Sequence, residues 1–379
     1  MDSKRNSSAE RERTLIQDSL AAEYNGFESV LTPTGAWCAD AWITTAALIA
    51  KTEKLKFLVA LRPGLSSPTL TAQQAHAFQR LSGDRLILNV VVGGEDIEQR
   101  AYGDHSTKEE RYAKAGEVLD FIDRIWSEGA VGEGGGHPID YNGDYLDITG
   151  AHLTGPAQKR PPDFFGGSSA AGIATAAAHA DTYLTWGEPV EQVGEKLAAV
   201  DDKARTLGRT VEHGVRLHVI ARATEDEAWA EAQKLLDGID PDAVRAVQDG
   251  LARSQFEGQR RMTELHGRGS NFTARADART LEIAPNLRAG VGLVRGGAGT
   301  ALVGSYDQVA ERLAEYRAVG ASHFILSGYP HLEETFHVGE GIVPALQRRG
   351  LSVANHPDPE NADSEDGHFA TPFADASAS

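Results

Sequence analysis

The chain has 379 residues, of which 41% are hydrophobic and 24% charged, a composition that is ordinary for a folded protein and excludes global disorder. Its formal net charge of -18 argues against a nucleic-acid-binding surface, and no apolar run reaches the roughly 18–20 residues of a membrane helix. The single cysteine, Cys38, excludes an internal disulfide framework and a cysteine-based zinc site, and it suits a reducing cytoplasm.

Seven short apolar runs bounded by turn-forming residues predict buried strands. They lie at 27–31, 56–61, 85–92, 163–166, 182–185, 215–221 and 323–326. Segments with helical spacing of apolar residues alternate with them. These predicted helices lie at 9–24, 40–50, 71–81, 109–126, 169–180, 190–207, 224–236 and 306–319. Such alternation is typical of an α/β protein with a parallel sheet.

Three segments depart from this alternation. Residues 129–150 are Gly-rich and then carry Asn142-Gly143 between alternating apolar positions, which predicts a hairpin insertion. Residues 250–300 are polar and Arg-rich, then Gly-rich, as expected of a mobile lid. From residue 353 the chain is acidic and rich in Pro, Ser and Ala, which predicts a disordered tail over 353–379. We expect residues 1–352 to form one barrel domain.

The strand pattern favours a TIM-type (β/α)8 barrel whose first strand is missing from the chain. The sequence opens in the helix that should follow that strand, and residues 1–8 are too polar to supply it. A doubly wound open sheet is the alternative, and it would normally carry a phosphate-binding glycine loop after its first strand. Residues 32–35 read Thr-Pro-Thr-Gly at that position, so the barrel is favoured.

In such a barrel the active site lies at the carboxyl ends of the strands. These ends carry no carboxylate cluster here, so we expect no metal site. Gly166-Gly167-Ser168-Ser169 leads directly into a helix, where backbone N–H groups and hydroxyls can bind a phosphate. The alternative is that Ser169 serves only as an N-cap.

Arginines point to an anionic substrate. Seven arginines and four acidic residues lie between Arg253 and Arg288, and Arg295 follows in the Gly-rich segment 292–304. A basic lid would cover an anion, whereas the alternative is a flexible surface loop. Arg216 and His218 point to the same side of one strand, where a buried guanidinium needs an anion or forms an Arg–Glu pair. Cys38 is more often a small buried hydrophobe than a nucleophile.

These segments together resemble the bacterial luciferase-like flavin monooxygenases, and most closely their FMNH2-dependent alkanesulfonate monooxygenase branch. The resemblance covers about residues 10–345 and is carried by seven segments. They are TGAWCADAW (34–42), LKFLVALRP (55–63), FGGSS (165–169), LTWGEP (184–189), RLHVI (216–220), AGVGLVRGGAGTALVG (289–304) and SGYPHLEE (327–334).

The resemblance implies a two-component monooxygenase that converts an alkanesulfonate and O2 to an aldehyde and sulfite. It further implies that an NAD(P)H-dependent FMN reductase supplies the reduced FMN, and that the protein is a homo-oligomer, a dimer or tetramer. Two alternatives stay open: an oxygenase of a related sulfur compound such as methanesulfonate, and a flavin-binding relative made inactive by the missing strand.

The resemblance also assigns roles to residues. The cofactor-binding positions are Asn89, Glu98, Tyr112, Ser168 and Ser169. The active-site positions are Cys38, Arg216, His218, Arg295, Tyr329 and His331. His218 is the proton-transfer candidate, with an unperturbed pKa near ~6.5.

Overall fold

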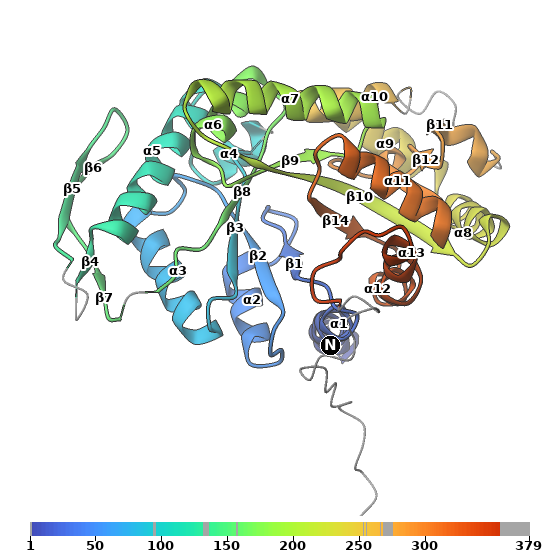
Figure 1. The fold of residues 1–379 in the computed structure, drawn as a ribbon, viewed down its shortest axis with the longest axis horizontal. Coiled ribbons are helices and arrows are strands. Elements are labelled where there is room, and N and C mark those ends of the chain that lie inside the picture. Colours follow the sequence, from blue (N-terminus) through green and yellow to red (C-terminus); the bar gives the residue numbers. More distant parts are fainter. Residues whose placement is uncertain are drawn as a thin grey trace, which may run out of the picture.

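The computed structural model describes residues 2–356, apart from 94–95, 132–135, 157, 253, 255, 266 and 268–275. Seven strands form a parallel arc in which each pairs with its neighbour (Figure 1). In spatial order they are β1 (Ser29–Thr32), β2 (Lys56–Leu61), β3 (Leu86–Val90), β8 (Asp163–Gly166), β9 (Thr182–Trp186), β10 (Glu212–Arg222) and β14 (His323–Ser327). The fold is a TIM-barrel-type α/β fold, and all seven predicted barrel strands are confirmed.

All eight predicted helices are present, with ends shifted by a few residues. They are α1 (Asp2–Tyr24), α2 (Ala41–Ile49), α3 (Pro68–Ser82), α5 (Lys108–Ser127), α6 (Ala170–His179), α7 (Val190–Thr206), α8 (Glu225–Asp237) and α11 (Tyr306–Ala318). Local chemistry sets several of these ends. Thr107, Thr224 and Ser305 each form a capping box that starts a helix, and Gly83 ends α3 in the left-handed conformation.

The interior of the barrel is filled by one apolar side chain from each of six strands. The buried members are Leu58, Ile87 and Phe164, and the partly buried members are Leu31, Leu184 and Ile325. Alternate residues of the same strands face outward and pack against the helices. This layer closes the barrel floor, so polar side chains beyond it face the carboxyl-end mouth.

β1 and β14 are the two edges of the arc, and the described backbone contains no pairing between them. Their residues are only partly buried. Helix α1 lies beside this seam and contacts both β1 and α12 (His331–Phe336) (Figure 1). The described strands therefore do not close the barrel by pairing at this seam, and α1 packs beside it. After α12 the chain continues through a π-helical turn (His337–Ile342) into α13 (Val343–Arg348).

The predicted hairpin is confirmed as β5 (Ile139–Asn142) and β6 (Asp147–Ala151), which are antiparallel. The Gly143 N–H donates to the Leu146 carbonyl across the turn, at 2.8 Å. A short parallel pair, β4 (Ala130–Val131) and β7 (Leu153–Thr154), joins this insertion to the body. The helix α4 (Asp96–Ala101), which was not predicted, lies between β3 and α5.

The described residues between 240 and 300 contain more regular structure than the sequence suggests. They contain α9 (Pro241–Leu251), α10 (Glu257–Leu265), β11 (Glu282–Ala284), β12 (Leu287–Arg288) and two 3-10 turns (Ala278–Leu281 and Val291–Leu293). β13 (Ala301–Ser305) follows and extends the sheet, pairing parallel to β10 and antiparallel to β12. Strands of two or three residues are too short to show alternation, and glycines obscure the start of β13.

Several predictions fall outside the described residues. Residues 253, 255, 266 and 268–275 of the predicted lid are among them, and so are residues 357–379 of the predicted tail. Within the described part of the chain, every helix is too short or too polar to span a bilayer.

Candidate active site

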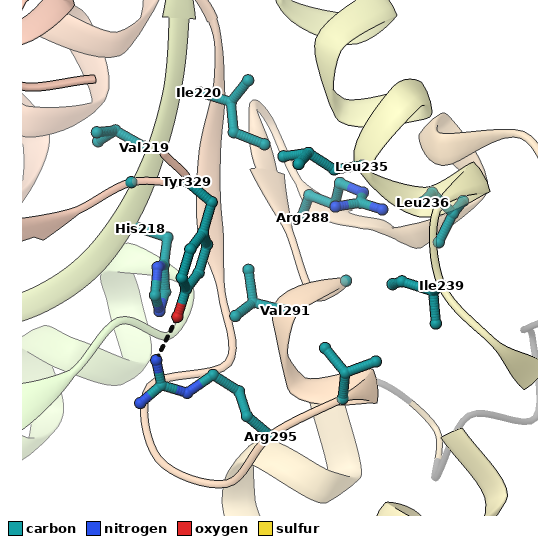
Figure 2. Close-up of a pocket in the computed structure, with 13 residues that line it drawn as sticks. His218, Val219, Ile220, Leu235, Leu236, Ile239, Arg288, Val291, Arg295 and Tyr329 are labelled. Atoms are coloured by element: carbon teal, nitrogen blue, oxygen red, sulfur yellow. Dashed lines mark hydrogen bonds between the residues drawn. The ribbon is translucent and has the colours of Figure 1, made fainter. Parts of the chain in front are cut away.

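Five of the six predicted active-site residues meet at the carboxyl ends of β10 and β14. β10 supplies Arg216 and His218, which are paired in register with Ile325 and Ser327 of β14. Tyr329 and His331 follow β14 directly, and Arg295 comes from the loop before β13. Figure 2 shows the Arg295 guanidinium reaching the hydroxyl of Tyr329, beside His218.

His218 is held as a neutral imidazole. It is 1% exposed, and its Nε2 lies 3.1 Å from the Ala298 carbonyl, an acceptor that requires the proton on Nε2. Nδ1 is therefore a buried lone pair, and it has no partner. Burial, followed by the charges of Arg295 and Arg216, lowers the pKa of His218 to about 3. This pKa lies far below the unperturbed value of histidine, and the sequence does not reveal the desolvation and nearby cations that lower it.

Two guanidinium groups face the same space. Desolvation, and then the charge of Arg295, lowers the pKa of Arg216 to about 10, and the Nε of Arg216 is buried without a partner. Arg295 donates to the Tyr329 hydroxyl at 2.5 Å and to the Gly296 carbonyl at 3.2 Å. No carboxylate among the described residues pairs with Arg216, so the Arg–Glu alternative is wrong. Neither guanidinium has a counter-ion within the described part of the chain, and such an arrangement suits an anion.

His331 closes one side of this cluster. Its ring lies 5.4 Å from that of Tyr329, centroid to centroid. Partial desolvation lowers the pKa of His331, and the negative charge of Asp18 on α1 opposes that effect. Helix α1 therefore contributes charge to the site, although sequence reasoning gave Asp18 no role.

Cys38 lies in a separate group of residues. Its Sγ is 3.4 Å from the Gly35 carbonyl, and its charged neighbours are Arg62 and Glu98. Burial raises the pKa of the Cys38 thiol, so the neutral thiol dominates and lacks the nucleophilicity of a thiolate. No contact that the structure describes joins Cys38 to the Arg216 cluster, and its catalytic role stays a prediction.

Glu98 organises the loop that carries Cys38. It accepts a hydrogen bond from the Ala36 amide at 2.9 Å and pairs with Arg62 at 2.7 Å. The Arg62 side chain is nearly buried, with two nitrogens unpartnered. The Glu98 carboxylate is therefore bonded to the protein's own groups in this structure. Its contact with a cofactor remains a prediction.

The Gly166–Ser169 segment forms a compact cradle at the start of α6. The Ser169 hydroxyl accepts from the Gly172 amide at 3.1 Å, so Ser169 is the N-cap of α6. A hydrogen bond also joins Ser169 to the hydroxyl of buried Tyr112. A Cβ on Gly172 would lie 3.1 Å from the Gly167 backbone and from the Tyr112 hydroxyl.

The cradle fits an anion. The amides of the first helical turn have no intrahelical acceptor, and the helix dipole favours negative charge there. Tyr183 donates to the Gly167 carbonyl at 3.0 Å and interacts with Ser168, which fixes the loop. Phosphate binding by Ser168 and Ser169 stays a prediction on this geometry.

Asn89 is the polar residue of β3 that faces the mouth. Ile87 lies in the interior layer, so Asn89, two residues further along, points to the same side, nearer the carboxyl end. It is paired in register with Ala60 and Phe164 and is partly exposed. The predicted cofactor residues thus lie on β3 or after β3 and β8, which are neighbouring strands.

A cavity of about 340 Å³ opens from the His218 cluster toward α8. Its walls are mostly apolar, and one further cation, Arg288, lies within it (Figure 2). Its lining residues include His218, Ile220, Leu235, Leu236, Ile239, Arg288, Val291, Val294, Arg295 and Tyr329. In the sequence, Arg288 is one arginine of a basic stretch, and no motif marks it as a residue of the cavity.

A model of the luciferase-like monooxygenase family matches residues 3–323 of this chain. Solved structures share the fold. Riboflavin lyase, solved with modified FMN and riboflavin, is 21% identical, with a TM-score of 0.74 over 93% of this chain and 88% of that chain. Long-chain alkane monooxygenase is 19% identical, with a TM-score of 0.72 over 90% and 85%. EDTA monooxygenase from Chelativorans sp. BNC1 is 19% identical, with a TM-score of 0.72 over 92% and 90%.

Proposed function

Because the chain belongs to the luciferase-like monooxygenase family, we propose that it is a two-component, FMNH2-dependent monooxygenase that desulfonates alkanesulfonates to an aldehyde and sulfite. The observation that carries the substrate class is the pair of guanidinium groups, Arg216 and Arg295, which face one space with no carboxylate bound to Arg216. A sulfonate presents three oxygens in a geometry that suits two planar forks of donors.

The cradle at the start of α6 supports FMN as the cofactor. Tyr112, Ser168 and Ser169 would hold the phosphate, together with the amides of the first turn. Asn89 lies on β3, the strand paired with β8 that leads into this cradle, so it would lie close to a cofactor held there. When bound, reduced flavin supplies the electrons for the activation of O2.

The protein's own residues bind, orient and transfer protons. Arg216 and Arg295 bind the sulfonate, and the Tyr329 hydroxyl, which accepts from Arg295, keeps its own proton to donate to an oxygen in the site. Nδ1 of His218 is the available proton acceptor. A bound sulfonate places negative charge beside the imidazole and raises its pKa, so proton uptake is coupled to substrate binding.

Burial keeps water away from His218, whereas Tyr329 is 38% exposed. The apolar walls around the cavity exclude solvent from the sulfonate carbon, and low polarity strengthens each charged contact there. The separate FMN reductase and a homo-oligomeric state belong to the same proposal, through the family resemblance.

Sulfite release tests the proposal. The protein is incubated with FMN, NADH and an added FMN reductase, and sulfite is measured for linear alkanesulfonates from methanesulfonate to octanesulfonate. We expect sulfite from the longer alkanesulfonates. Release from methanesulfonate alone favours the related sulfur-compound oxygenase, and FMN binding with no sulfite from any sulfonate favours the inactive relative.

A further inference from the structure

Arg288 is a buried cation with no partner among the residues that the structure describes. The residue is 3% exposed, and its Nε and Nη2 atoms are buried and make no hydrogen bond. Desolvation alone lowers the pKa of Arg288 to about 10, because no described charge lies near enough to oppose it. Burying an ionised side chain in this way is costly unless an anion joins it.

The surroundings of Arg288 explain why it stays unpaired. Glu282 on β11 is paired in register with Arg288 on β12. Its carboxylate does not reach the guanidinium, because it accepts a hydrogen bond from the Asn286 amide at 2.8 Å. The guanidinium packs over Gly290, where a Cβ would lie 2.3 Å from its central carbon. Any residue larger than glycine at position 290 would therefore displace the guanidinium from this place.

The cavity connects Arg288 to the sulfonate-binding cluster. Arg288 lies on the side that faces α8, whereas His218, Tyr329 and Arg295 lie on the other side (Figure 2). The other lining side chains are mostly apolar, and Val291 lies between Arg288 and the His218 cluster (Figure 2). The cavity thus contains two cations, Arg295 and Arg288, among mostly apolar side chains.

We propose that Arg288 binds a second anionic group, a carboxylate or sulfonate, at the far end of the substrate. This inference rests on the proposed function and names the substrate class of the same site: sulfonates with an apolar chain that ends in another anion. An uncharged alkyl end would leave the Arg288 guanidinium buried and unpaired, so plain alkanesulfonates are the poorer ligands.

Calorimetry without flavin tests this first. Pentanesulfonate is compared with its ω-carboxy derivative, and straight-chain dicarboxylates from glutarate to suberate serve as unreactive probes. We expect the doubly charged sulfonate to bind at least about 10-fold more tightly than pentanesulfonate. Equal affinities for the two sulfonates in the wild-type protein overturn the inference, whether or not any variant folds.

Two arginine variants locate the effect. Arg288→Met keeps an unbranched, mostly apolar stem and removes the charged guanidinium group, and we expect it to lose about 100-fold in affinity for the doubly charged sulfonate. Arg279→Met is the matched control, since Arg279 is exposed and already pairs with Glu225 at 2.9 Å. An affinity gap that survives in Arg288→Met shows that Arg288 is not the receptor.

Sulfite assays separate the two proposals. If plain and ω-carboxy sulfonates release sulfite equally in wild type and Arg288→Met, the inference is wrong and the proposed function stands. If no sulfonate is cleaved but the dicarboxylates bind in an Arg288-dependent manner, the anion site stands and the proposed reaction fails.

Discussion

The imidazole of His218 lies stacked on the phenol ring of Tyr329, with ring centroids 5.4 Å apart and planes 17° apart. This contact joins β10 to the loop after β14, and the hydrogen bond from Arg295 to the Tyr329 hydroxyl adds the loop before β13. Three segments far apart in sequence therefore fix one another at the barrel mouth. A rigid arrangement of this kind favours precise placement of a small anion.

Replacing Arg295 removes one of the two sulfonate-binding cations. We expect Arg295→Ala to lower kcat/KM for sulfite release by about 1000-fold, and Arg295→Lys to be nearly as poor because an ammonium does not replace the planar fork. The fold should survive, since the contacts of Arg295 are confined to Tyr329 and its own loop. Arg245→Ala, at an exposed position on α9, is the control. Wild-type turnover in either Arg295 variant contradicts the assignment.

The lowered pKa of His218 makes stability depend on pH. The folded pKa of about 3 is below the unfolded value near ~6.5, so the unfolded state binds the proton more strongly between them. The contribution of neutral His218 to the free energy of unfolding is complete above about pH 6.5 and is lost as pH falls toward 3. The free energy of unfolding then changes by up to about 1.4 kcal/mol per pH unit. Urea unfolding between neutral and mildly acidic pH should show a shallower dependence in His218→Asn. If the free energies of unfolding of the wild type and His218→Asn depend on pH in the same way, His218 does not have the lowered pKa.

Gly172 tests the FMN cradle. In Gly172→Ala the new methyl would press on the Gly167 backbone and the Tyr112 hydroxyl, and we expect the Kd for FMN to rise about 10-fold. Alanine is preferred over glycine within a helix by about 0.5–1 kcal/mol, and this preference offsets much of the loss in folding free energy that the crowding causes. Gly250→Ala is the matched control, because nothing lies within 4 Å of its added Cβ. Unchanged flavin quenching in Gly172→Ala would remove the cradle from the binding site.

The sequence predicted the barrel well because its strands are apolar runs between clear turn residues, as in Lys56–Leu61. It also brought Arg216 and His218 together, since alternation along a strand fixes their common side. It did not reveal the environment of these residues. The pKa of His218 depends on burial and on Arg295, some eighty positions away, and the unpaired state of Arg288 depends on where the Glu282 carboxylate points. Both are properties of the folded chain.

The flavin is expected to arrive from another protein. The purified chain with FMN and NADH should oxidise NADH no faster than the buffer, because the sequence contains no nicotinamide-binding fingerprint. Adding an FMN reductase should start both NADH oxidation and sulfite release. NADH consumption by the purified protein alone contradicts the two-component scheme.

A single-turnover experiment tests the central claim most directly. FMN is reduced without oxygen, bound to the protein, and mixed with aerated buffer containing an alkanesulfonate or an equal concentration of the corresponding alcohol. The account predicts about one sulfite per reduced FMN with the sulfonate, and a loss of most of that yield in Arg295→Ala. Complete flavin oxidation that yields only hydrogen peroxide, with no sulfite from any sulfonate supplied, would contradict it.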